Sequence, residues 1–91
     1  MKKRSRARIV YDILNHLAFR GSTTITGVSY IARMPYDRAE ELVMDLEKRG
    51  LVKVTKTESG RIVSITDKGL KALEDLEKAI KILEKLGLDT T

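Results

Sequence analysis

Basic side chains gather at three places along the 91-residue chain, and each group could bind an anionic polymer. The first group lies within the first eight residues: Lys2, Lys3, Arg4, Arg6 and Arg8. Basic arms of this kind commonly lie along phosphates. The alternative is a solvated tail that binds nothing. We expect an N-terminal arm that contacts a polyanion.

The other two groups lie further along the chain. Lys53, Lys56 and Arg61 flank the turn signal Glu58-Ser59-Gly60. A basic hairpin can lie against a nucleic-acid backbone or in its minor groove, although exposed lysines are ordinary on strands. Arg38 is the best candidate for a base or phosphate contact, with support expected from Tyr30, Arg33 and Tyr36.

The net charge favours a polyanion or an acidic surface as the partner. The chain has 18 Lys and Arg against 13 Asp and Glu, a balance of +5. Up to Thr66 there are 13 basic and 7 acidic residues, whereas from Asp67 onward there are 5 basic and 6 acidic residues. The excess positive charge therefore belongs to the first two thirds of the chain.

Residues for other kinds of chemistry are scarce. His16 is the only histidine and there is no cysteine, so the usual zinc patterns cannot form. No glycine-rich phosphate loop or nucleophile elbow is present. We expect no enzyme activity, no cofactor, no metal and no small-molecule substrate. The absence of cysteine and of a long apolar run favours a cytoplasmic protein without a membrane partner.

Hydrophobic spacing predicts the elements that would position the basic residues. The order is a helix over about 5–19 capped by Ser5, a minor strand over 22–25, a helix from 26 or 27 to 33, a helix from about Pro35 to Arg49, strands around 52–55 and 63–65, and a helix from Asp67 to about Leu86 capped by Thr66. This order predicts a mainly α fold with a small β-hairpin: a winged helix-turn-helix over residues 1–66, followed by a long helix over 67–91.

The third predicted helix is acidic, which is unusual for a helix expected to enter a DNA groove. It carries five acids against three bases. Helical spacing places Ala39, Leu42, Val43 and Leu46 in the core. Pairs such as Asp45 with Arg49, four residues apart, could offset part of the acidity. We expect affinity to come mainly from the arm, the turn and the wing.

Three stretches carry a family resemblance: "IVYDIL", "LEKRGLV" and "SITDKGLKALEDLEKAIKILEKL". Together they resemble archaeal winged-helix DNA-binding proteins, most closely the small basic type of about ten kilodaltons. The absence of glutamine and the abundance of Lys and Glu also follow the hyperthermophile trend. The resemblance implies a homodimer that binds double-stranded DNA, as a transcriptional regulator or a chromosome-organising protein, through an antiparallel coiled coil of the last helices.

The spacing of apolar residues in the last helix supports the dimer independently. Leu73, Leu76, Ile80 and Leu83 repeat at intervals of three and four, and Ala79 and Leu86 lie beside them. One small domain can cover only part of this stripe, and the rest would be left in water. The remaining alternative for function is a winged helix that contacts a basic protein through its acidic third helix.

Overall fold

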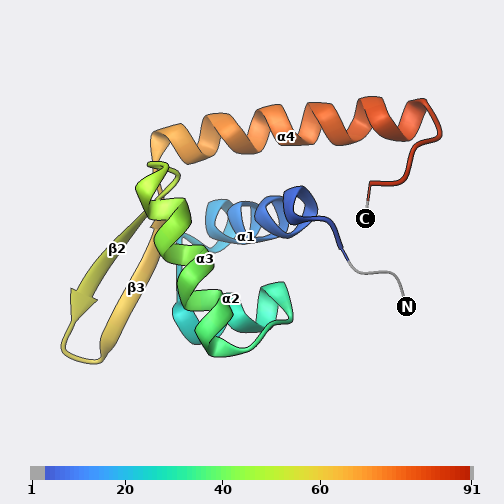
Figure 1. The fold of residues 1–91 in the computed structure, drawn as a ribbon. Coiled ribbons are helices and arrows are strands. Elements are labelled where there is room, and N and C mark those ends of the chain that lie inside the picture. Colours follow the sequence, from blue (N-terminus) through green and yellow to red (C-terminus); the bar gives the residue numbers. More distant parts are fainter. Residues whose placement is uncertain (1–3, 91) are drawn as a thin grey trace.

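A computed structural model describes residues 4–90 of the chain. The elements follow the order α1 (Arg6–Arg20), β1 (Ser22–Thr24), α2 (Ile25–Ala32), α3 (Tyr36–Lys48), β2 (Val52–Thr57), β3 (Gly60–Ile65) and α4 (Asp67–Lys85). The predicted order is confirmed: a helix-turn-helix is followed by a two-stranded wing and a long helix. In Figure 1 the wing of β2 and β3 projects from one end, and α4 runs alongside α1 and continues beyond it.

Side-chain caps set the starts of three helices. The Ser5 hydroxyl accepts a hydrogen bond from the Arg8 amide, and the Thr66 hydroxyl accepts one from the Gly69 amide, so both predicted caps are confirmed. The Thr24 hydroxyl caps α2 in the same way. The predicted start of α2 at residue 26 or 27 is therefore wrong by one or two residues, because this cap brings Ile25 into the helix.

The connection between α2 and α3 also differs from expectation. The predicted end of α2 at Arg33 is wrong, because the helix ends at Ala32 and Arg33 takes a left-handed conformation with φ 54°. Pro35 precedes α3 with φ −59° and ψ 153°, and its carbonyl accepts the Ala39 amide at 3.0 Å. Its fixed φ and missing N–H suit this position, where an amide would have no helical partner.

The predicted minor strand β1 gains its partner from the wing. The sheet has the antiparallel order β1-β3-β2, with Thr23 opposite Val63 and Val54 also opposite Val63. At the outer end of the wing, Lys56 lies opposite Arg61. Strand β1, which pairs with β3 of the wing, joins the wing to the helix-turn-helix, because β1 leads directly into α2.

The core lies between the three short helices and the inner ends of the strands. Its buried members are Ile13, Leu14, Leu17, Ile25, Val28, Ala32, Ala39, Leu42, Val43, Leu46, Val52 and Val63. The first half of α4 covers one side of this core through partly buried Ala72, Leu73 and Leu76. The fold therefore leaves the outer face of α3, the wing and the second half of α4 open.

Candidate nucleic-acid interface

The third helix, α3, buries one face and exposes the other. Its buried residues are the four predicted ones: Ala39, Leu42, Val43 and Leu46. Successive residues turn by about 100°, so the opposite face exposes Asp37, Arg38, Glu41, Met44 and Lys48. This face carries both signs of charge.

The wing is tied to the start of α3 by one basic side chain. The Arg61 guanidinium on β3 forms an ion pair with the Glu40 carboxylate and donates a hydrogen bond to the Tyr36 hydroxyl at 3.3 Å. The hydrogen bond to Glu40, and secondarily that to Tyr36, raises the pKa of Arg61 above its ordinary value. Two predicted site residues, Tyr36 and Arg61, therefore lie in contact.

Two further acids of α3 fasten the helix to its surroundings. Asp45 pairs with Arg49 at 3.1 Å, as predicted, and also with Arg6 of α1 at 3.0 Å. The hydrogen bond from Arg49, helped by that from Arg6, lowers the pKa of Asp45 against an opposing effect of desolvation. Glu47 accepts the Val54 amide at 3.1 Å. Much of the acidity of α3 is thus engaged within the protein.

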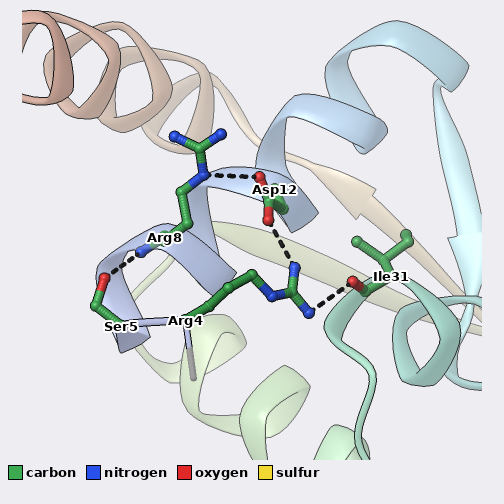
Figure 2. Close-up of polar contacts among 5 residues, drawn as sticks. All are labelled: Arg4, Ser5, Arg8, Asp12 and Ile31. Atoms are coloured by element: carbon green, nitrogen blue, oxygen red, sulfur yellow. Dashed lines mark hydrogen bonds and ion pairs between the residues drawn. The ribbon is translucent and has the colours of Figure 1, made fainter. Parts of the chain in front are cut away.

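The described members of the first basic group, Arg4, Arg6 and Arg8, all contact the domain. Figure 2 shows Arg4 donating to the Asp12 carboxylate at 2.6 Å and to the Ile31 carbonyl at 3.1 Å. Arg4 thereby joins the start of α1 to the end of α2. Its side chain is 23% exposed, so little of it remains for a partner.

Arg6 and Arg8 belong to α1, and both are paired. The Nε atom of Arg8 lies 3.5 Å from Oδ1 of Asp12. The Cζ atom of Arg8 lies over the Tyr11 ring, 5.3 Å from the ring centroid. Arg6 remains 68% exposed while contacting Asp45. Lys2 and Lys3 lie outside the described residues. Phosphate contact by this group stays a prediction, and Arg6 is its most accessible described member.

The end of α2 and the turn that follows it expose two further predicted residues. Tyr30 in α2 is 79% exposed, and Arg33, three residues later in the turn, is also exposed. Arg33 is the one non-glycine residue with positive φ among residues 4–90. A left-handed conformation at a residue with a Cβ costs about 1 kcal/mol or more. The Ser29 hydroxyl holds the turn by donating to the Met34 carbonyl at 2.6 Å.

Replacing Arg33 by glycine is expected to stabilise the fold while weakening polyanion binding. The left-handed strain disappears, which outweighs the greater backbone freedom of glycine by about 0.5 to 1 kcal/mol. Urea denaturation measures the gain, and anisotropy of a labelled duplex measures the affinity. Arg33→Lys is the control, since it keeps both the strain and the charge. If the glycine variant binds the duplex with unchanged affinity, Arg33 does not contribute to the interface.

A family model described as winged helix-turn-helix matches residues 3–84. This range contains all seven elements except the last residue of α4. The chain belongs to the winged helix-turn-helix family. Among solved structures, this winged helix is similar to Sso10a-2, a DNA-binding protein from Sulfolobus solfataricus. The identity is 31% and the TM-score 0.81, over 91% of this chain and 85% of that chain.

Longer regulators share the winged-helix fold at lower identity. The transcriptional regulator BldR from Sulfolobus solfataricus gives a TM-score of 0.74 at 20% identity, over 88% of this chain and 60% of that chain. The transcriptional regulator Tm0710 from Thermotoga maritima gives a TM-score of 0.69 at 24% identity, over 90% of this chain and 61% of that chain. The winged helix thus spans about three fifths of these regulators. The comparison with curated proteins gave no match.

The wing of this winged helix carries two open basic residues. Lys53 and Lys56 are exposed on β2, and neither forms an ion pair with any of residues 4–90. Arg33 and Arg38 are likewise unpaired within the described part of the chain. These four bases, together with exposed Tyr30 and Tyr36, form the candidate interface. None of the described helices is long and apolar enough to cross a membrane.

The predicted dimerisation residues of the winged helix divide into two groups. Leu73 and Leu76 pack on the core of their own chain. Further along α4, Ala79 is exposed, Ile80 is half-buried without packing on the core, and Leu83 and Leu86 are 36% and 67% exposed. The unpartnered stripe therefore lies in the second half of α4.

The contacts of three acidic residues of the winged helix escaped sequence reasoning. Glu40 reaches the wing, Glu47 accepts a strand amide, and Asp12 receives Arg4 and Arg8. The Arg8–Asp12 spacing of four residues was a readable signal for a helical pair. The other contacts join residues from different elements, and no local spacing predicts them.

Proposed function

We propose that this protein binds double-stranded DNA as a homodimer and acts as a transcriptional regulator or a chromosome-organising protein. The observation that carries the proposal is that four exposed bases of the turn, α3 and the wing form no ion pair within residues 4–90: Arg33, Arg38, Lys53 and Lys56. It is supported by the 31% identity to Sso10a-2, whose structure is described as that of a DNA-binding protein.

Each part of the interface has a role in this proposal. The N-terminal end of α3 enters the major groove, where Arg38 contacts a base or phosphate. Lys53 and Lys56 place the wing along the backbone or the minor groove. Tyr30, Arg33 and Tyr36 contact the phosphates flanking the groove. Most of the affinity comes from phosphate contacts, and no cofactor or enzyme activity is involved.

The second half of α4 supplies the dimer. Its stripe of Ala79, Ile80, Leu83 and Leu86, of which only Ile80 is half-buried in the single chain, is covered by α4 of a second copy. A symmetric pair holds the two wings and the two α3 helices at a fixed separation. Residues 67–91 therefore act as the dimerisation segment in this proposal, while part of α4 also completes the core.

Fluorescence anisotropy across a salt series tests the proposal. The labelled duplexes are a random sequence and the DNA upstream of the protein's own coding region. Similar binding to both with a steep salt slope favours a chromosome-organising role. A large preference for the upstream DNA favours a local regulator. Absence of binding to either duplex at low salt rejects DNA binding.

The double variant Lys53→Ala, Lys56→Ala is expected to bind every duplex more weakly, by about the same factor. Each lysine that contacts a phosphate contributes roughly one unit to the salt slope, so the slope should fall by about two. Lys78→Ala with Lys85→Ala removes the same charge from exposed positions of α4 and serves as the control. An equal loss in both double variants would indicate net charge rather than a wing contact.

A protein partner is the second candidate, and one observation favours it. Asp37 and Glu41 are exposed on α3 without an ion pair in residues 4–90, beside half-exposed Met44. A basic protein surface could dock there while α4 supplies assembly. Co-purification of a protein without nucleic acid would favour this candidate, as would the absence of duplex binding at low salt.

A further inference from the structure

The ion pair between Glu40 and Arg61 lies on the open surface between α3 and the wing. A shallow hollow there is lined by Glu40, Glu41, Met44 and Arg61, among others. The side chains of Arg61 and Glu40 are 32% and 38% exposed. Pairs as exposed as this contribute little stability, so either partner can exchange for a ligand at small cost. The pair therefore suits a contact that is remade on binding.

Arg61 is held against α3 by two contacts. Its guanidinium bonds to the Glu40 carboxylate and to the Tyr36 hydroxyl, whereas Lys56, opposite it in the wing, is unpaired in the described chain. If Arg61 left for a phosphate, the Glu40 carboxylate would face DNA without its counter-charge. Phosphates and the acceptor atoms of bases would both repel it.

One base offers the carboxylate a replacement partner. In the major groove the cytosine amino group is a donor, and carboxylates accept from it. The adenine amino group lies beside the N7 acceptor, which suits an amide rather than a carboxylate. Arg61 uses Oε2 of Glu40, and Oε1 accepts no hydrogen bond from residues 4–90. Glu40 therefore has an oxygen with which it can accept from a base.

We propose that Glu40 is a specificity-determining residue: it keeps Arg61 from phosphate at most sequences and releases it where a cytosine amino group takes the place of Arg61. This inference rests on the proposed DNA binding. At a cytosine-containing site the wing gains a phosphate contact, and the carboxylate gains a base contact. At other sites the ion pair stays closed, so Arg61 adds nothing to affinity. In this proposal Glu40, an acid of α3, makes the protein prefer DNA sites that contain cytosine.

Selection from a pool of randomised duplexes tests the base preference of the full-length protein. The wild type should enrich a cytosine at one position. A matched pair of duplexes with cytosine or adenine there should then differ in affinity on the order of tenfold. Glu40→Gln should reverse the preference towards adenine. Glu41→Gln, which removes the neighbouring charge without touching Arg61, should leave it unchanged. Circular dichroism checks that each variant is folded.

The salt slope of Arg61→Ala tests the exchange itself. The slope should fall by about one on the cytosine duplex and stay the same on the adenine duplex, because only the first releases Arg61 to a phosphate. Equal slopes on both duplexes, the same selected sequences for wild type and Glu40→Gln, or no enriched base would overturn this inference. Each of those results is compatible with DNA binding. Absence of duplex binding by the wild type would overturn the proposed function as well.

Discussion

The double substitution Ile80→Lys, Leu83→Lys is expected to convert the protein from a dimer into a monomer and to weaken duplex binding about a hundredfold or more. Two charges placed in the α4 stripe repel their copies and oppose burial of the stripe. Loss of the second α3 and wing removes the gain from bivalent binding. Light scattering measures the molecular mass, and anisotropy of a duplex long enough for both wings measures the affinity.

The control for this variant adds the same charge to α4 without touching the stripe. Glu74→Gln with Glu84→Gln changes two exposed side chains and also raises the net charge by two. It should stay dimeric. The fold of the lysine variant should persist, because neither Ile80 nor Leu83 packs on the core. A wild type that is monomeric, or a lysine variant with unchanged mass, would contradict the dimer.

Gly69→Ala is expected to lower the free energy of unfolding by about 2 to 3 kcal/mol, although alanine ordinarily stabilises a helix. A Cβ at Gly69 would collide with the Leu51 carbonyl oxygen and lie 2.7 Å from Cγ1 of Ile65. The Leu51 carbonyl also accepts a hydrogen bond from the Thr66 amide at 3.2 Å, so α4 cannot shift away without breaking this hydrogen bond at its start. A domain of this size should melt roughly 10 to 20 °C lower. Calorimetry measures the change.

Gly27→Ala provides a matched comparison at the same position of another helix. Gly27 also donates its amide to a threonine cap, but a Cβ there would meet the Thr23 side chain rather than backbone. Rotation of Thr23 can relieve that contact, so the loss should be smaller. Similar losses in both variants would indicate that backbone collision at Leu51 does not set the cost.

Local signals predicted the elements because their causes lie within a few residues. Ser5 and Thr66 cap helices through hydrogen bonds to amides three residues on, and Gly50 with φ 76° follows the C-cap of α3. The start of α2 was misplaced because Ile25 reads equally well as the end of a strand. The Thr24 cap and the end of the β1–β3 pairing at Thr24 together decide between the two, and the β3 partner lies about forty residues away in the chain.

The site was less predictable, since its contacts join distant elements. Sequence reasoning named Arg61 and Tyr36 separately, and it counted Glu40 only as one of the five acids of the third helix. Their contact depends on how the wing packs beside α3, which no spacing along the chain expresses. Similarly, Arg4 was assigned to an arm because its neighbours are basic. In the structure Asp12, one helical turn after Arg8, forms an ion pair with Arg4 and holds Arg4 against the domain.

The engagement of acids on α3 changes the electric field that an approaching polyanion meets. Glu40 and Asp45 face guanidinium groups of the protein at close range, so each pair acts at a distance as a dipole rather than as a free negative charge. Dipolar fields fall off faster than those of single charges and are screened within about 10 Å at ordinary ionic strength. Among the acids of α3, exposed Asp37 and Glu41 therefore oppose the open bases farther from the surface, whereas Glu40 and Asp45 act only once contact is made.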